Sequence, residues 1–420
     1  MSGPIMTIRM SFRKLFVIDD PNIVTYLFEK KGAQYSDRYV SQVAKLGQWD
    51  RDIIFIEYGP TLKHYRTLLQ RALNNRVALD YLPIQEHEVK RLMRRLHKTP
   101  ESFMDHVHLM AGSVAIRMVY GYKVDSAQDP LVQSAEKVMS IFSDIMTPGG
   151  WMVEVLPFLR FLPTWFPGTT FHQMVASSRP VLHAYAQNTF DFVKSELAKG
   201  TAEPSFTSKL LHSKTGNEVT SEELHIKSVS SSLYGAASDT TVSAVKSFFL
   251  AMTLYPNVQA KAQSEINTYL EHNQSASGRF LTIADREKLP YTSALVRELL
   301  RWHPVVNLTA HRSCGEDGNN VVIGENVYRI PAYSIVIVNM WSMLHNPNVY
   351  PDPERFMPER HMVENPPPPP EIYAFGFGRR DSYRSTVDVV IYQVRTVKVP
   401  EKQKQSTQAI WQQHIGQLHD

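Results

Sequence analysis

The chain of 420 residues is long enough to bury a sizeable core, either as one large domain or as two to three ordinary ones. Hydrophobic residues make up 43% and charged residues 20%, as in an ordinary globular protein, and a net charge of +4 without a dense basic run argues against a nucleic-acid partner. The one cysteine, Cys314, excludes an internal disulfide, and no signal-peptide pattern or membrane-spanning apolar run is present. The sequence therefore predicts a soluble or peripheral protein.

The first half of the chain reads as a strand hairpin followed by helices. Residues 5–17 alternate in hydrophobicity, and Asp20-Pro21 provides a cap for a helix ending near Lys31. Helical periodicity then predicts helices over 62–75, 85–96, 102–120, 130–146 and 171–199. The segment Trp151–Pro167 is apolar but too broken for a helix. It could be a mobile lid, a membrane-contacting patch, or a loop that packs on the core.

The second half contains the longest predicted helix and the remaining strands. A polar linker around 203–222 precedes a helix over 226–254, and further helices are expected over 257–271 and 289–302. Strand-like runs follow at 320–323, 327–330 and 334–340, before a proline-rich coil over 347–370. The predicted fold class is mainly α with a small β-sheet.

An acid and two hydroxyls interrupt the apolar helix 226–254. Asp239, Thr240 and Thr241 follow Gly235-Ala236-Ala237-Ser238. A buried carboxylate costs several kcal/mol unless it has a partner or a function, and a threonine inside a helix can bond to the carbonyl one turn earlier. The segment could hold water beside a reaction centre, or it could be one solvent-facing turn of a long helix.

Three further patterns follow in the last third of the chain. Glu298 and Arg301 lie three residues apart on one helix face, where they could form an ordinary surface pair. Arg360, in the proline-rich coil, could join them in a three-charge cluster. The glycine-rich turn Phe375-Gly376-Phe377-Gly378-Arg379-Arg380 comes next.

The order and spacing of these motifs resemble the cytochrome P450 family, of the eukaryotic microsomal and perhaps fungal type. The resemblance runs from Gly3 to Arg380, which predicts one domain over 1–380 and a tail over 381–420 outside the family pattern. Ala236–Thr241 resembles the oxygen-activating segment, with Ala237 where glycine is usual. Tyr58–Arg66 resembles the start of another family helix, with Leu62 in place of a usual tryptophan.

The resemblance implies the cytochrome P450 fold, haem b as cofactor and a monooxygenase of secondary metabolism. Such an enzyme inserts one atom of O2 into a hydrophobic small molecule, using electrons from NADPH-cytochrome P450 reductase. Asp239 and Thr240 would relay protons, while Glu298, Arg301 and Arg360 would hold the coil that supports the haem loop. Haem contacts would come from six residues, namely Lys63, Arg66, His311, Phe375, Gly378 and Arg380. Alternatively, Lys63 and Arg66 form a solvated helix face, and His311 lies in a loop.

The sequence departs from the family at the position of the iron ligand. Counting from Phe375, the axial cysteine should be residue 382, which is Ser382, and a serine hydroxyl is a poor iron ligand. The tail 381–420 is polar and lacks the apolar helix that the family places there, so the C-terminal part of the fold is expected to be incomplete and the tail largely disordered.

These departures predict a truncated or misassembled family member, with no metal ligand and doubtful haem retention. The alternative function is therefore a catalytically inactive haem-fold remnant. The family resides on the cytosolic face of the endoplasmic reticulum. Because the N-terminus is expected to start after the family's membrane anchor, we predict a cytoplasmic or peripheral location, with membrane contact through Trp151–Pro167.

Overall fold

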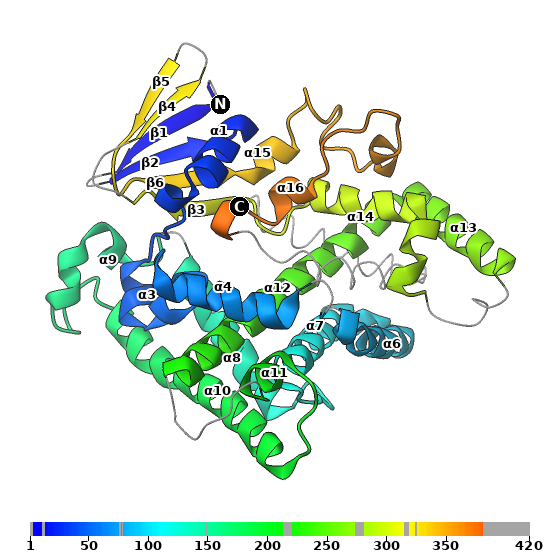
Figure 1. The fold of residues 1–420 in the computed structure, drawn as a ribbon, viewed down its shortest axis with the longest axis horizontal. Coiled ribbons are helices and arrows are strands. Elements are labelled where there is room, and N and C mark those ends of the chain that lie inside the picture. Colours follow the sequence, from blue (N-terminus) through cyan, green and yellow to red (C-terminus); the bar gives the residue numbers. More distant parts are fainter. Residues whose placement is uncertain are drawn as a thin grey trace.

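A computed structural model of the chain describes residues 3–10, 13–74, 77, 79–147, 149–212, 221–273, 281–314, 319–323 and 326–380. A large helical body carries two small sheets at one corner (Figure 1). The predicted fold class is confirmed. The expected tail over 381–420 lies outside the described residues.

The larger sheet joins two strands near the N-terminus to two strands that lie more than 280 residues later in the sequence. Its strand order is β1-β2-β6-β3, with β1 Ile5–Met10, β2 Arg13–Ile18, β6 Ile335–Asn339 and β3 Leu308–Arg312. Strand β2 pairs in parallel with β6, and the other two pairings are antiparallel. Strands β4 (Asn319–Ile323) and β5 (Asn326–Ile330) form the separate hairpin. The sequence predicted the first hairpin and the other late strands, whereas β3 was missed.

The long helices closely match the sequence predictions. Apolar residues at helical spacing give α4 Pro60–Leu73, α6 Leu82–Lys98, α7 Phe103–Tyr120, α8 Pro130–Met146, α10 Phe171–Lys199, α13 Pro256–His272 and α14 Pro290–Trp302. Asp20 caps α1 (Pro21–Thr25) by accepting hydrogen bonds from the N–H groups of Asn22 and Ile23, and a π-helical turn, η1 (Tyr26–Lys30), continues it. Shorter helices are α2 Gly32–Tyr35, α3 Gln42–Leu46, α15 Met340–Leu344 and α16 Glu371–Ala374.

Helix α12 (Ser221–Leu254) crosses the centre of the body (Figure 1). It packs against α7, where the rings of Phe103 and Phe249 lie 5.6 Å apart, and both side chains are fully buried. The core therefore fixes the helix that carries Asp239 and Thr240. Part of the expected linker before it is helical, because Phe206 and Leu210 bury one face of α11 (Phe206–His212).

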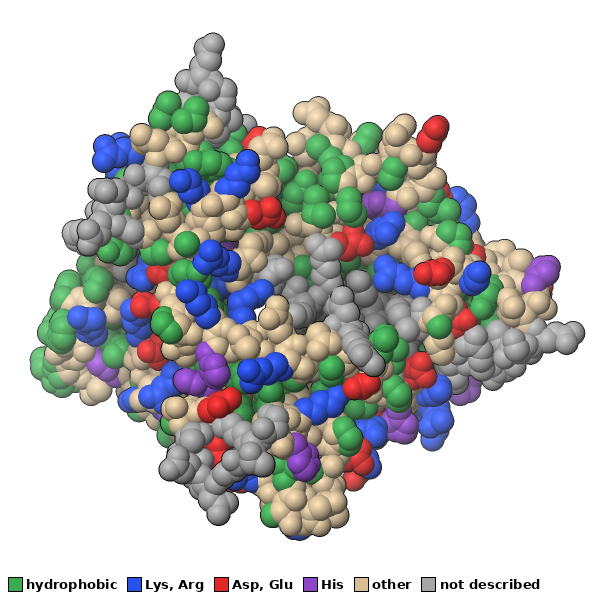
Figure 2. Space-filling view, in the orientation of Figure 1, with side chains coloured by type: hydrophobic (Ala, Val, Ile, Leu, Met, Phe, Trp, Pro, Cys, Tyr) green, Lys and Arg blue, Asp and Glu red, His purple; other side chains and the backbone are tan. Residues whose placement is uncertain are grey.

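The apolar segment after α8 is irregular, as predicted. It contains only the short α9 (Met152–Val155) and the 3-10 turn η5 (Pro157–Phe161). Val153 and Leu159 pack into the core, but Phe161 and Trp165 are 75% and 79% exposed. Figure 2 shows hydrophobic side chains gathered at this end of the molecule. The segment thus combines a packed inner side with an apolar outer side.

Candidate active site

Glu298 is the centre of a buried charge cluster between α14 and the coil 351–361. The Arg301 guanidinium donates to both carboxylate oxygens at 2.8 and 2.9 Å, and Arg360 Nε donates to Oε1 at 3.1 Å. Glu298 and Arg301 are fully buried, which excludes the surface-pair interpretation. Arg301 also donates to the carbonyls of Leu344 and Arg355, so the cluster holds the coil against α14.

His361 completes this cluster and was missed from the sequence. Its Nε2 lies 2.9 Å from Glu298 Oε2, and the N–H of Met357 donates to Oε1. Burial by itself would raise the pKa of Glu298, but the hydrogen bonds from His361 and Arg301 outweigh it and lower that pKa. The signal in the sequence for this fourth member of the cluster was a histidine directly after the predicted Arg360.

The glycine-rich turn docks against η1 and the residues that follow it. Gly378 has φ +57°, and a Cβ atom there would lie 2.1 Å from the carbonyl oxygen of Phe28, so only glycine fits. Phe377 is buried, with its ring 6.1 Å from that of Phe28. Phe375 is half-buried at the end of α16. The turn therefore delivers Arg380 to a fixed place.

Arg380 meets His311 and Arg38 beside the larger sheet. Its guanidinium donates to the carbonyls of Ser36, Ile53 and Ile56 at 2.8, 3.0 and 2.5 Å. Burial, followed by the charge of Arg38, lowers the pKa of Arg380 to about 9, while Asp37 opposes the shift. Burial and the charges of these two arginines also lower the pKa of His311, which is therefore neutral at pH 7. His311 lies on β3 rather than in a loop, with Nδ1 3.0 Å from Tyr35 O.

Arg38 is the functional candidate that sequence reasoning missed. Its guanidinium donates to Thr309 Oγ1 at 3.0 Å and to Ala310 O, whereas its buried Nε finds no hydrogen-bond partner among the described residues. Burial lowers its pKa to about 10. Among the described residues, no carboxylate forms an ion pair with Arg38 or Arg380, because the nearby Asp37 pairs with Arg312. Two half-buried cations without a matching acid in the described part of the chain make this cluster suited to an anionic group.

The two predicted cations of α4 are placed differently from each other. Arg66 is close enough for its charge to lower the pKa of Arg380, so it belongs to the rim of the cationic cluster. Lys63 is exposed, with its Nζ 5.7 Å from the centre of the Tyr58 ring. The structure thus brings Arg66, His311 and Arg380 together and leaves Lys63 on the outer face of α4.

On α12, the predicted acid and hydroxyl are within reach of solvent. Thr240 Oγ1 donates to Ala236 O at 2.7 Å, and the buried Thr241 does the same to Ala237 O. Asp239 is exposed, but crowding by protein atoms still raises its pKa, and Lys246 opposes the shift. Both threonines therefore donate to the carbonyl one helical turn earlier, as the sequence suggested. The pKa of Asp239 lies above its usual value.

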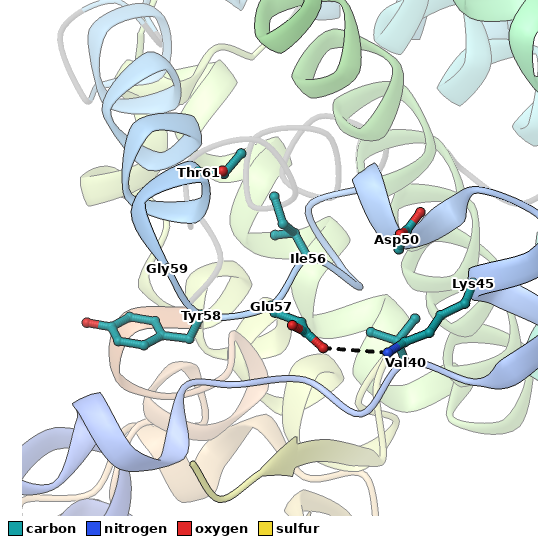
Figure 3. A pocket seen from close by; sticks show the side chains of 8 residues that line it. All are labelled: Val40, Lys45, Asp50, Ile56, Glu57, Tyr58, Gly59 and Thr61. Carbon is teal, nitrogen blue, oxygen red and sulfur yellow. Dashed lines mark ion pairs between the residues drawn. The ribbon is translucent and has the colours of Figure 1, made fainter. Parts of the chain in front are cut away.

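A cavity of about 420 Å³ opens between α3 and the start of α4 (Figure 3). Within it, Lys45 Nζ lies 3.6 Å from Glu57 Oε1, and Arg312 pairs with the same carboxylate at 3.2 Å. Tyr58, Gly59 and Thr61 form another part of its lining. The cationic cluster and the α12 motif do not line it, so this cavity is separate from the candidate active site.

Comparison with known proteins agrees with this geometry. The family model for cytochrome P450 matches residues 1–381. The chain belongs to the cytochrome P450 family. It is 36% identical over 385 residues to cytochrome P450 monooxygenase claR of Ampulloclitocybe clavipes, covering 90% of this chain and 69% of that protein. It is 34% identical over 386 residues to cytochrome P450 monooxygenase ppsD of Aspergillus oryzae, covering 90% and 71%. The recognition from sequence is confirmed, and in general terms the chain is a P450 monooxygenase of fungal type.

The cofactor of a cytochrome P450 is haem, and one side of the site fits it. Haem carries two propionates, and Arg380 together with Arg38, whose Nε has no partner among the described residues, supplies donors that such carboxylates need. His311 is neutral and its Nδ1–H donates to Tyr35 O, so its Nε2 adds no donor. The iron side is different, since residue 382 is a serine beyond the described residues. Cys314 cannot replace it as a ready thiolate, because its Sγ donates to the carbonyls of Ala33 and Gln34 and burial raises its pKa.

In the described part of this cytochrome P450, none of the helices is both long and apolar enough to cross a bilayer.

Proposed function

We propose that the chain's site is built for monooxygenation of a hydrophobic small molecule, with one atom of O2 entering the substrate. The observation that carries this proposal is the pair of half-buried cations, Arg38 and Arg380, without a described acid partner. Haem would supply the chemistry of dioxygen activation when bound. The tail 381–420, which the family pattern does not cover, forms no part of the proposed domain 1–380.

The roles of the chain's own residues follow from their positions. Arg38, Arg380 and Arg66 would hold the propionates, with the neutral His311 beside them, while Phe375 and Gly378 shape the loop that carries Arg380. Lys63 contributes charge from the outer face of α4. Asp239, whose pKa is raised by burial, and Thr240 would relay protons toward the reaction centre. The cluster of Glu298, Arg301 and Arg360 holds the supporting coil.

Electrons would come from an NADPH-dependent cytochrome P450 reductase. The exposed Lys63 and Arg379, whose cationic groups lie 5.7 and 5.2 Å from the ring centre of Tyr58, support a docking face for an acidic partner at the start of α4. The exposed Phe161 and Trp165 support peripheral contact with a membrane surface, which fits the cytosolic face of the endoplasmic reticulum.

A second candidate function rests on Ser382. If no thiolate reaches the iron, haem loses the electron donation on which the family's chemistry depends. The chain would then be a haem-binding remnant that retains the fold but does not oxygenate substrates.

The carbon monoxide difference spectrum of the reduced full chain, expressed with excess haem precursor, separates these functions. The red-shifted thiolate band that gives the family its name would support monooxygenation by this polypeptide. Bound haem without that band would support the remnant function, and a Ser382→Cys variant would show whether the missing sulfur is the cause. No haem retention in either protein would contradict both proposals.

A further inference from the structure

Two histidines meet where α4 packs on the beginning of α12. His64 lies on α4 and His225 on α12, and their ring centres are 5.1 Å apart, with the ring planes tilted at 58°. The ring of Tyr65, the next residue of α4, lies 5.6 Å from that of His225. None of the roles proposed above uses this pair.

The core fixes the backbone on both sides of the pair. Tyr65 of α4 and Ile226 of α12, which directly follow the two histidines, are buried in the same hydrophobic cluster. The two histidine side chains themselves are half-buried, so an ion can reach them from solvent. Because only the side-chain torsions of the rings are free to move, a ligand held by both rings orders little of the chain.

The separation of the two rings is the one that a shared metal ion requires. A Zn–N bond is about 2.1 Å long, and the centre of an imidazole ring lies about 1.1 Å behind its nitrogen. Two imidazoles at the tetrahedral angle around one ion therefore have their centres about 5.2 Å apart. The observed 5.1 Å matches this value.

One nitrogen of the pair has nothing to bind. His64 Nε2 is buried and finds no hydrogen-bond partner among the described residues. Contact with the ring of His225 covers ring surface, but it does not satisfy the lone pair or proton of a nitrogen. A buried polar atom without a partner costs free energy, and a metal ion would supply a partner that the second ring can share.

The charges around the pair favour a cation. Burial, followed by the charge of His64, lowers the pKa of His225, whereas Glu222 opposes that shift. His225 is therefore neutral at pH 7, which is the form that binds a metal, and Glu222 adds negative charge one turn earlier on α12. In the described part of the chain, no three His, Cys, Asp or Glu side chains are grouped to hold a metal ion. Water would therefore complete the coordination of an ion at this pair.

We propose that His64 and His225 form a two-histidine site for a divalent transition-metal ion such as Zn²⁺, completed by water, which ties α4 to α12. Imidazole suits Zn²⁺, Ni²⁺ and Cu²⁺, whereas Mg²⁺ prefers oxygen ligands. Because α4 carries Arg66 and α12 carries Asp239, the ion stabilises the frame of the candidate active site without taking part in its chemistry. The site does not depend on haem or on turnover, so it stands or falls separately from the proposed function.

The test measures binding of zinc chloride to the full chain at pH 7.5, after metals have been removed with EDTA and the EDTA has been dialysed away. Calorimetry gives the dissociation constant, and thermal unfolding with and without zinc shows whether the ion stabilises the fold. His64→Gln and His225→Gln each remove one ligand. His97→Gln removes an exposed histidine of α6 and is the control variant, while magnesium chloride is the control ion.

We expect the wild type and His97→Gln to bind zinc with a dissociation constant of about 100 μM or less, and each of the other two variants to bind it at least about tenfold more weakly. Zinc should also raise the melting temperature of the wild type, because it binds the folded state, and magnesium should not. Unchanged zinc affinity in His64→Gln or in His225→Gln would overturn the inference, as would the absence of zinc binding by the wild type.

A second measurement needs no variant to fold. The electron paramagnetic resonance spectrum of the wild type with one equivalent of Cu²⁺ should show coupling to two imidazole nitrogens. Coupling to fewer than two nitrogens would contradict the site.

Discussion

Gly378 lies so close to Phe28 that a Cβ atom on it would stand 2.1 Å from the Phe28 carbonyl oxygen. This contact joins the glycine-rich turn to η1, across almost the whole length of the described chain. The contact also fixes the backbone position of Arg380, which follows two residues later.

Gly378→Ala should therefore destabilise the protein by roughly 1–3 kcal/mol, because it adds a steric clash to an unfavourable positive φ. Urea unfolding followed by circular dichroism measures the change. Gly200→Ala is the matched control, since Gly200 has φ +73° but no atom within 4 Å of the added Cβ. Equal losses in the two variants would show that the turn can move away from Phe28.

Glu298→Gln should cost about 3–5 kcal/mol, because it leaves Arg301 and Arg360 buried without their shared carboxylate. The free energy of unfolding in urea provides the measurement. The control is Glu359→Gln, which removes a partly exposed ion pair with Lys261 and should cost less than about 1 kcal/mol. A loss below that of the control would mean that the cluster does not hold the coil.

Arg38→Met should act in opposite directions on the two states of the protein. Removing a half-buried cation that has no acid partner among the described residues should leave the haem-free chain as stable or more stable, while haem affinity falls about tenfold or more. Thermal unfolding without haem and haemin titration by absorbance check both effects. Arg94→Met, on the exposed side of α6, should change neither quantity. Unaltered haemin affinity in Arg38→Met would exclude Arg38 from the propionate site.

Replacing both Phe161 and Trp165 by serine should weaken binding to phosphatidylcholine–phosphatidylserine vesicles by at least about tenfold, because the two side chains supply large exposed apolar area. Vesicle flotation is the measurement. The control pair is Val322→Ser with Val327→Ser, which removes exposed apolar residues from the β4–β5 hairpin. Comparable losses in both pairs would indicate nonspecific adhesion.

Asp52 should give the stability of the protein a distinct pH dependence. Its folded pKa is raised to about 6 from an unfolded value of about 4, so the protonated form favours the folded state. The stability it contributes is complete below about pH 4 and is lost as the pH rises through about 6. The wild type should therefore lose stability relative to Asp52→Asn over this interval and then remain parallel to it. A flat difference between pH 4 and 7 would mean that Asp52 titrates normally.

The sequence predicted the long elements well because their patterns are local. Helices α8 and α10 begin and end as expected, since many turns of apolar periodicity support each of them. Strand β3 was missed because it has only five residues and is specified by its pairing with β6 rather than by its own pattern.

The candidate site was predictable where several residues form a motif, and not where one residue acts through tertiary placement. Glu298, Arg301 and Arg360 were identified from their spacing and family resemblance, and the structure unites them. Arg38 carries no local signal, because its importance arises only when β3 and the glycine-rich turn place His311 and Arg380 near it.

The parallel pairing of β2 with β6 has a consequence for biosynthesis. Leu15 pairs with Ile335, so β1 and β2 can pair only with each other until β6 has been translated more than 300 residues later. Helices such as α7 can form and pack long before that moment, whereas the hairpin of β1 and β2 must wait with an unsatisfied edge. Shielding of the nascent chain by a chaperone is therefore expected to matter for residues 5–18.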